Sequence, residues 1–185
     1  MKYLINRIEE TLSAKPNAVI AIDGCCAAGK TTLAAYLSER FGLQVVHMDD
    51  FFLLPELRTA ERLSRPGGNV HYERFIDEVI GGLNGSKEFC YKVFNCRKGT
   101  FDGSVKTNPK LPVIVEGAYS MHPEIPDIYD LKIFLETDCK TQLERIEKRG
   151  GADVLETFKS KWIPLENLYF KTFKIKDKCD IKLSL

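Results

Sequence analysis

The strongest constraint on the fold is an eight-residue stretch, Gly24 to Thr31, that contains two glycines and ends in Gly-Lys-Thr. An unbroken apolar run, residues 18–22, comes just before it, and apolar residues recur every three to four positions through residues 30–42. The unbroken run is typical of a strand buried on both faces, and the later spacing predicts a helix that ends at Gly42. A strand, a glycine-containing turn and a helix in this order favour a fold with a parallel sheet.

The same stretch matches the pattern of a phosphate-binding loop at every fixed position. Its glycines let the backbone turn so that successive N–H groups converge on a phosphate at the positive end of the helix. Lys30 can then bridge the β- and γ-phosphates during catalysis, and the Thr31 hydroxyl can ligate Mg²⁺. A chance glycine turn is the alternative, but the flanking strand and helix argue against it. We expect ATP and Mg²⁺ as ligands, with ATP contacts from Gly24, Cys25, Cys26, Ala27, Ala28, Gly29, Lys30, Thr31 and Thr32.

Two cysteines, Cys25 and Cys26, lie inside this loop and beside the start of the helix. The positive end of a helix lowers the pKa of a nearby thiol and favours its thiolate. We therefore expect alkylation of these thiols to inactivate the protein and ATP to protect them. The alternative is that both thiols are buried and serve only as small side chains in a tight loop.

Strand and helix patterns alternate along the rest of the chain. The clearest further helix covers residues 72–83, where apolar residues fall at i, i+3, i+4 and i+7. Other helices are expected near residues 4–12, around Leu143 and Ile146, and from about Val154, with Pro164 in a first turn. Strands are expected at 45–48, 89–94, 113–115, 131–135 and 180–185, whereas 98–110 is expected to be turn-rich. This alternation predicts a three-layer α/β fold, a parallel sheet flanked by helices, in one domain over residues 1–185.

The charge and cysteine content narrow the classes of function. Net charge is +1, with 27 basic and 26 acidic residues, so no overall field favours nucleic acid or an anionic membrane. No apolar stretch approaches the roughly 20 residues of a membrane span. The six cysteines lack metal-binding spacing, and a chain of this size does not depend on a disulfide framework. We expect a cytoplasmic protein without nucleic-acid or membrane partners, either a monomer or a homo-oligomer.

Carboxylates follow two of the expected strands. Asp49 and Asp50 follow the strand at 45–48, and Glu116 follows the strand at 113–115. In an open parallel sheet, ligands bind at the carboxyl ends of the strands. Asp49 can accept the proton of an acceptor hydroxyl and help to hold Mg²⁺, and Glu116 can hold Mg²⁺ through water. Alternatively, Asp49 or Asp50 caps a helix, or Asp50 contacts the substrate. The alternative for Glu116 is a structural salt bridge to a residue of the lid.

Two arginines, Arg145 and Arg149, are four positions apart and share one face of an expected helix. They can close over the transferred phosphoryl group and neutralise its developing charge, which is a catalytic role. A solvated helix face is the alternative, because acidic and basic residues are interleaved there. We expect a lid over residues 145–165 and a substrate loop over 53–70. Residues 158–170, with Trp162, Pro164 and Glu166, are expected to form a flap over the base or the substrate. The alternative for Trp162 is a place in the core.

Taken together, these segments resemble the uridine kinase family and its relatives, the nicotinamide riboside kinases and phosphoribulokinases. The resemblance spans residues 18 to about 150 and rests on the phosphate loop, Asp49-Asp50-Phe51-Phe52, Val115-Glu116-Gly117 and the Arg145/Arg149 pair. It implies the phosphate-loop (P-loop) NTPase fold of nucleoside-monophosphate-kinase type. It also implies transfer of the γ-phosphate of ATP to a hydroxyl of a small molecule, by default a nucleoside such as uridine or cytidine, with Asp49 as the general base.

The resemblance also implies acceptor contacts from Asp50, Phe52, His71, Tyr91 and Arg97. The chain differs from the family where a ribose-binding acid is expected, and His71 or Glu73 is the candidate replacement. It also lacks the base-contacting histidine of the family. Two alternatives therefore stay open. One is a kinase for another small alcohol, such as nicotinamide riboside, a vitamin or a sugar phosphate, and the other is a regulatory module that binds ATP without phosphorylating an acceptor.

Overall fold

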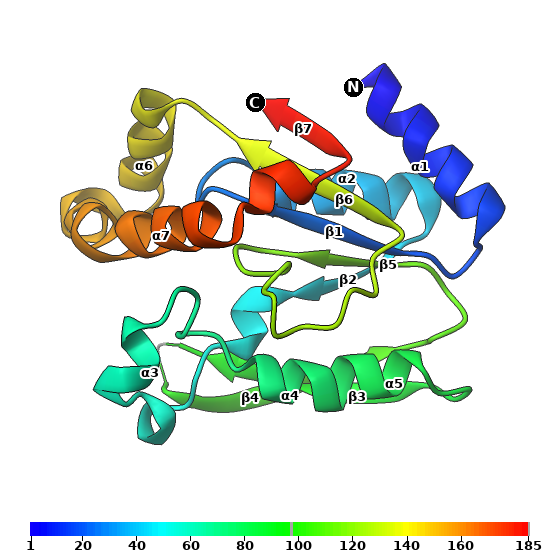
Figure 1. Cartoon of the computed structure of the whole chain (residues 1–185), viewed down its shortest axis with the longest axis horizontal. Coiled ribbons are helices and arrows are strands. Elements are labelled where there is room, and N and C mark those ends of the chain that lie inside the picture. The colour runs from blue at the N-terminus through cyan, green and yellow to red at the C-terminus, as the bar shows by residue number, and fades with distance from the viewer. Residues whose placement is uncertain (97, 185) are drawn as a thin grey trace.

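A parallel sheet of five strands forms the centre of the computed structural model, which describes residues 1–96 and 98–184 (Figure 1). The strand order is β2-β5-β1-β6-β7, and each neighbouring pair is parallel. The strands are β1 (Val19–Gly24), β2 (Gln44–His47), β5 (Val113–Glu116), β6 (Leu131–Glu136) and β7 (Ile181–Ser184). The predicted α/β fold with a parallel sheet is confirmed.

Helices cover both faces of this sheet, as predicted (Figure 1). On one face, Ile20 of β1 shares a core with Leu4 of α1 and Leu37 of α2. On the other face, Ala21 of β1 shares a core with Phe75 and other residues of the helical segment that follows β2. Successive residues of a strand point to opposite faces, so the unbroken apolar run lets β1 contribute to both cores. The helices of the first face are α1 (Lys2–Ala14) and α2 (Lys30–Phe41).

A second sheet is antiparallel and has two strands, β3 (Phe89–Asn95) and β4 (Thr100–Thr107). Phe89 lies opposite Thr107, so the prediction that residues 98–110 are turn-rich is wrong for 100–107. The β4 strand is mostly exposed, and Gly103 has a φ of +97° within it. Because an exposed strand needs few apolar residues, the alternation that would mark it is largely missing from the sequence.

Between β2 and β3 the chain forms short helical turns before one longer helix. Met48–Phe51, Pro55–Leu57 and α3 (Ala60–Ser64) are the short ones. The segment 53–70 is largely irregular, as predicted, although Leu53 and Val70 at its ends are buried. The predicted helix over 72–83 is confirmed as α4 (Tyr72–Phe75), a π-helical turn at Ile76–Ile80, and α5 (Gly81–Leu83).

The C-terminal part of the chain places two helices beside the phosphate loop. In α6 (Cys139–Thr157) the Asp138 side chain caps the first turn by accepting the Thr141 N–H at 2.9 Å. Gly151, with φ +79° and ψ −176°, breaks the helical geometry of α6. A π-helical turn at Phe158–Trp162 leads into α7 (Ile163–Phe173), with Pro164 in its first turn, as predicted. Ile175–Lys178 forms a short turn before β7. No helix among the described residues is long and apolar enough to cross a membrane.

Candidate active site

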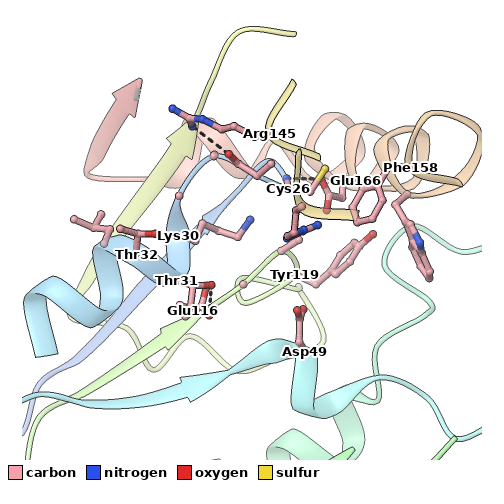
Figure 2. A pocket seen from close by; sticks show the side chains of 18 of the residues that line it. Cys26, Lys30, Thr31, Thr32, Asp49, Glu116, Tyr119, Arg145, Phe158 and Glu166 are labelled. Carbon is pink, nitrogen blue, oxygen red and sulfur yellow. Dashed lines mark hydrogen bonds between the residues drawn. The ribbon is translucent and has the colours of Figure 1, made fainter. Parts of the chain in front are cut away.

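The phosphate loop joins the carboxyl end of β1 to the first turn of α2 (Figure 2). Gly24 has a φ of +137°, and a Cβ at this position would lie 1.9 Å from the Leu135 carbonyl oxygen, so only glycine fits. Gly29, with φ +97°, stands at the N-cap of α2, and Ala27 also has a positive φ of +57°. These left-handed residues turn the chain around the N-terminus of a helix, where backbone N–H groups attract anions.

Lys30 lies along this loop with only 8% of its surface exposed. Its Nζ donates hydrogen bonds to the carbonyl oxygens of Gly24 and Cys25, at 2.7 and 2.8 Å. The ammonium group is therefore beside the loop backbone and points toward the space that Asp49 faces (Figure 2). A positive charge on a flexible side chain in this position can contact an anion that the loop binds.

Thr31 and Glu116 come together below the loop. The Thr31 hydroxyl donates to Glu116 Oε1 at 3.0 Å, and His47 Nδ1 lies 2.6 Å from the same oxygen. This contact with Glu116 raises the pKa of His47. Glu116 is only 5% exposed, and its partners are Thr31 and His47 rather than a residue of the expected lid. The described residues contain no group of three or more His, Cys, Asp or Glu side chains arranged to hold a metal ion.

A cavity of about 880 Å³ opens between the phosphate loop, the carboxyl ends of β2 and β5, and the C-terminal helices. It brings together most of the site residues expected from the sequence: Cys26, Ala27, Ala28, Gly29, Lys30, Thr31, Thr32, Asp49, Phe52, Glu116, Arg145 and Arg149. Gly24, Cys25, Asp50, His71 and Tyr91 are not among its lining residues. The expected acceptor contact Arg97 lies outside the described residues.

The adjacent carboxylates of Asp49 and Asp50 point into different surroundings. Asp49 faces the cavity (Figure 2), and burial together with the nearby Glu116 charge raises its pKa, against the opposing charge of Lys30. A raised pKa makes a carboxylate a better proton acceptor near neutral pH. Asp50 instead lies near Tyr91 and His47, and burial raises its pKa as well. Neither residue caps a helix with its side chain, so the capping alternative is wrong.

Arg145 and Arg149 approach the cavity from α6. Arg145 donates to the carbonyl oxygen of Ala27 in the loop at 3.1 Å, and the Arg149 guanidinium lies 5.3 Å from the centre of the Phe158 ring. Trp162 is half-buried on the cavity wall, with its ring centre 6.1 Å from that of Phe52. The expected lid thus contributes both positive charge and aromatic surface to the cavity.

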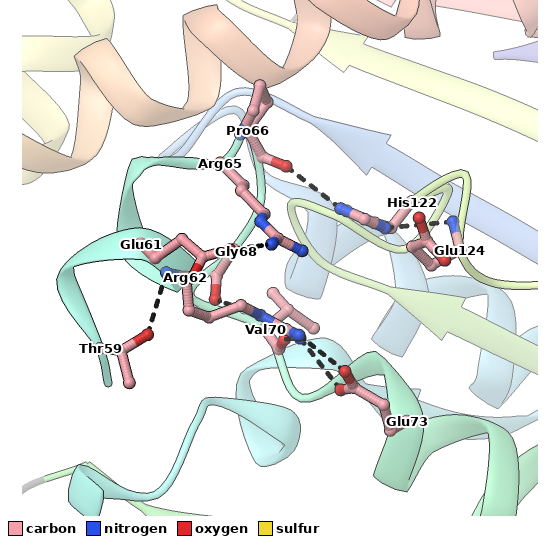
Figure 3. A network of polar contacts seen from close by, with 10 residues as sticks. All are labelled: Thr59, Glu61, Arg62, Arg65, Pro66, Gly68, Val70, Glu73, His122 and Glu124. Carbon is pink, nitrogen blue, oxygen red and sulfur yellow. Dashed lines mark hydrogen bonds and ion pairs between the residues drawn. The ribbon is translucent and has the colours of Figure 1, made fainter. Parts of the chain in front are cut away.

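The candidate ribose-binding residues His71 and Glu73 lie elsewhere. They line a smaller pocket of about 330 Å³, where Glu73 Oε1 accepts from Arg62 Nη1 at 2.7 Å (Figure 3). Arg62 also donates to the carbonyl oxygens of Gly68 and Val70, at 3.1 and 2.9 Å. Glu73 is therefore engaged in organising the 53–70 segment. Neither His71 nor Glu73, the two candidates to replace the ribose-binding acid, lines the main cavity.

Three polar residues make contacts in the site that nothing in the sequence indicates. Asp23, fully buried, accepts the N–H of Gly24 and Tyr119 and the hydroxyl of Tyr169. Tyr119, with φ +75°, lines the cavity beside Glu116. Glu166 also lines the cavity, and its Oε2 accepts the Cys26 N–H at 2.8 Å. Glu166 lies one residue beyond the expected lid but inside the flap expected over residues 158–170, and nothing in the sequence marks its contact with Cys26.

The expectation of a reactive thiolate in the loop is wrong. Cys26 is buried, and burial together with the nearby Glu166 carboxylate raises the pKa of its thiol. The pKa of Cys25 is raised for the same two reasons. Desolvation and a neighbouring negative charge both disfavour a thiolate, and here they outweigh the helix N-terminus. Cys26 matches the alternative of a small, buried side chain, whereas Cys25 is only half-buried.

Comparison with known proteins relates the chain to kinases. No protein-family model matches the chain. It is 25% identical to the deoxyadenosine/deoxycytidine kinase of Bacillus subtilis, over 83% of this chain and 75% of that protein. It is 28% identical to the cytidylate kinase of Methanopyrus kandleri, over 75% of this chain but only 65% of that protein, slightly less than two thirds.

Solved structures share the fold. A possible uridine kinase from Bacillus stearothermophilus superposes with a TM-score of 0.69 at 19% identity, over 98% of this chain and 99% of its own. The D-glycerate 3-kinase of Cryptococcus neoformans superposes with a TM-score of 0.63 at 15% identity, over 90% of this chain and 87% of its own. The fold is therefore that of the P-loop kinases, as the resemblance to the uridine kinase family implied.

Proposed function

We propose that the chain is a phosphotransferase that moves the γ-phosphate of ATP onto a hydroxyl group of a small molecule. The observation that carries the proposal is that the phosphate loop, Lys30 and Asp49 line one cavity. A triphosphate held by the loop directs its terminal phosphate into this cavity, and Asp49 accepts the proton of a hydroxyl held opposite. Positioning and charge stabilisation of this kind account for most of the catalysis in phosphoryl transfer.

The proposal includes a magnesium ion beside the loop. Thr31 and Glu116 offer oxygen atoms 3.0 Å apart, and the Asp49 carboxylate lines the same cavity. Mg²⁺ usually takes one or two protein carboxylates together with substrate phosphates and water, which fits this donor set. When bound, the ion would neutralise charge on the phosphoryl group being transferred.

Residues 145–165 are proposed as the lid over this site. Arg145 and Arg149 would turn toward the transferred phosphoryl group, whose developing charge they can stabilise. Both are exposed side chains on α6, so they can change rotamer at little cost. Residues 53–70 are proposed as the acceptor loop, because Phe52 at its start lines the cavity.

A nucleoside such as uridine or cytidine is proposed as the acceptor. Phe52, Tyr119 and Trp162 line the cavity, and aromatic rings favour stacking with a flat base. The two kinases related by sequence carry names of nucleoside and nucleotide kinases. Another small alcohol is the alternative, since D-glycerate 3-kinase shares the fold. A cytoplasmic location and the oligomeric state stay predictions.

The test compares Asp49→Asn with its neighbour Asp50→Asn, after a panel of nucleosides and small alcohols has identified the best acceptor with labelled ATP. A general base acts mainly in the transition state, so Asp49→Asn should lower kcat by about 10²–10⁴-fold. Its affinity for MgATP, measured by calorimetry, should fall only modestly. Asp50→Asn, which does not line the cavity, should change the acceptor KM or the stability by about 1 kcal/mol.

Three outcomes contradict parts of this proposal. If Asp50→Asn shows the large loss in kcat, the base has been assigned to the wrong neighbour. If neither variant affects transfer, Asp49 is not the base. If the protein binds MgATP but phosphorylates no member of the panel, the regulatory module becomes the better interpretation.

A further inference from the structure

Cys26, in the middle of the phosphate loop, is held at both ends of its own backbone. Its N–H donates to Glu166 Oε2 at 2.8 Å, and its carbonyl oxygen accepts from Gln142 Nε2 at 3.0 Å. Gln142 Nε2 also lies 3.2 Å from the Cys26 sulfur. All three residues are nearly buried, with 7–8% of their surface exposed. These contacts join positions that are 116 and 140 residues apart in the chain.

The two side chains stand on either side of the proposed lid. Gln142 lies on α6 just before residues 145–165, and Glu166 lies on α7 just after them. Within the lid, Gly151 interrupts the helical geometry. The lid is therefore a segment with a break in its middle whose two ends are tied to one residue of the phosphate loop.

We propose that Gln142 and Glu166 are positioning residues for the nucleotide, which couple the proposed lid to the phosphate loop through Cys26. The inference rests on the proposed function, because it concerns the loop that would hold ATP. Because the N–H and the carbonyl group of Cys26 are both fixed, the peptide groups on either side of Cys26 keep one orientation. The N–H groups that follow need this orientation to converge on a phosphate. The ends of the lid stay in place while the part between them moves.

Neighbouring contacts support this interpretation. The Tyr169 hydroxyl, one turn after Glu166 on α7, donates to Asp23 at 2.8 Å, and Asp23 accepts the Gly24 N–H at 2.7 Å. Arg145 donates to the Ala27 carbonyl oxygen. The loop is thus held at Gly24, through Asp23, and at Cys26 by side chains outside residues 145–165, whereas the Arg145 contact belongs to the lid itself. Buried hydrogen bonds of this kind are costly to leave unmade, so they define one geometry.

The experiment measures the affinity for MgATP and MgADP by calorimetry in Gln142→Ala, Glu166→Ala, Glu166→Gln and the double alanine variant. Each single alanine variant should weaken both nucleotides about fivefold to tenfold, because the loop grips phosphates that ATP and ADP share. Glu166→Gln keeps an oxygen that can accept the Cys26 N–H, so it should stay within about threefold of wild type. The double variant should lose less than the product of the single losses, since both contacts act on one residue.

A second measurement addresses the lid directly. Hydrogen exchange should slow across residues 145–165 when MgADP binds to the wild type, and this protection should be lost in the double variant. The acceptor KM should not change. Glu39→Ala, which removes an exposed acid near the C-terminal end of α2, is the matched control and should behave as wild type throughout. Thermal melts identify any variant that fails to fold, and the isosteric Glu166→Gln then still reports on the site.

Several results would overturn the inference. Wild-type affinities in all variants would mean that the contacts do not position the loop. A loss in Glu166→Gln as large as in Glu166→Ala would mean that charge, and not the hydrogen bond, is what matters. A raised acceptor KM with unchanged nucleotide affinity would make Glu166 an acceptor contact. If the wild type binds neither nucleotide, the proposed function fails and this inference fails with it.

Discussion

Lys30 and Asp49 carry opposite charges on the walls of one cavity, and each is surrounded by further charged groups. Lys30 lowers the pKa of Asp49 and of Glu166, whereas burial raises the pKa of both acids by more. Arg149 also lowers the pKa of Asp49. Charges act strongly over short distances in a partly buried site. A triphosphate that arrives with Mg²⁺ adds less negative charge to this balance than a bare triphosphate does.

The thiols of the protein should differ sharply in their reaction with iodoacetamide. Cys26 is 8% exposed and its pKa is raised, so it should stay unlabelled in the native protein at pH 7.5. Cys90 and Cys139 are exposed and should react within minutes. Mass spectrometry of peptides after timed quenching provides the measurement.

Full labelling of Cys26 after unfolding in guanidinium is the control for this experiment. Rapid labelling of native Cys26, with protection by MgATP, would instead support the reactive thiolate that its place beside a helix N-terminus predicts.

The sequence identifies the phosphate loop that contains Cys26, but it does not identify the residues that surround Cys26. The fixed positions Gly24, Gly29, Lys30 and Thr31 follow from local chemistry, because a tight turn around phosphate demands them. The state of Cys26 depends on Glu166, which is 140 residues away. A contact of that range depends on how α7 packs, and nothing in the residues near Glu166 marks it. Residue types that act locally can be predicted, and partners brought by the fold cannot.

At the scale of elements, Arg62 organises the 53–70 segment, the proposed acceptor loop. Its guanidinium donates to the carbonyl oxygens of Gly68 and Val70 and to the Glu73 carboxylate (Figure 3). It also lies 4.0 Å from the centre of the Tyr72 ring. The side chain is 16% exposed. One residue of α3 therefore fixes the path of the chain into α4. The segment between them forms no helix or strand whose backbone hydrogen bonds would fix that path, so it depends on this side chain.

Arg62→Ala should accordingly loosen this loop. Loss of hydrogen bonds from a charged, largely buried donor should lower the free energy of unfolding by about 1–3 kcal/mol. Amide hydrogen exchange over residues 65–71 should speed up, while exchange in the central sheet changes only with global stability. Urea denaturation and exchange mass spectrometry give the two readouts.

Arg65→Ala is the matched control, because Arg65 is exposed and pairs with the exposed Glu61. It should change stability by no more than about 0.5 kcal/mol. Equal effects of the two variants would mean that Arg62 does not organise the loop.

How well the sequence predicts each strand depends on how much of the strand is buried. The unbroken apolar runs predict the buried strands β1, β5 and β6 to within two residues of their observed ends. β4 has no such pattern, since only Thr107 in it is buried. Its pairing with β3 comes from backbone hydrogen bonds, which every residue type can make. Strands that pack into a core are predictable, and exposed partner strands are much less so.

At the scale of the whole molecule, the cavity lies where separate parts of the chain meet. The loop after β1, the ends of β2 and β5, and α6 and α7 all contribute to its walls. The order of the parallel strands creates this meeting point, because their carboxyl ends share one edge. A ligand bound there contacts many elements at once and should stabilise them together.

MgATP should therefore raise the stability of the entire protein. At a free concentration one hundred times its Kd, a ligand that binds only the folded state adds about 2.7 kcal/mol. For a chain of this length that corresponds to a rise in Tm of about 5–10 °C. Differential scanning fluorimetry with and without MgATP provides the measurement.

Lys30→Ala should fold but gain almost none of this increase, because the ammonium group that serves the phosphates is gone. Lys87→Ala, which changes an exposed lysine distant from the cavity lining, should gain as much as wild type. A full increase in Lys30→Ala would remove Lys30 from the nucleotide site.

β2 and β5 are neighbours in the sheet, yet the chain makes one long excursion, residues 48–112, between them. That excursion carries Asp49, Phe52 and Cys96 into the cavity, whereas the phosphate loop and α6 come from outside it. Under the proposed function, this excursion encodes Asp49 and Phe52 of the acceptor site, whereas Tyr119 and Trp162 lie outside it, as the phosphate loop does. A single recombination event that replaces the excursion beyond Asp49 would change one wall of the acceptor site and leave the phosphate loop intact. Evolution can therefore diversify such an enzyme by exchanging one cassette.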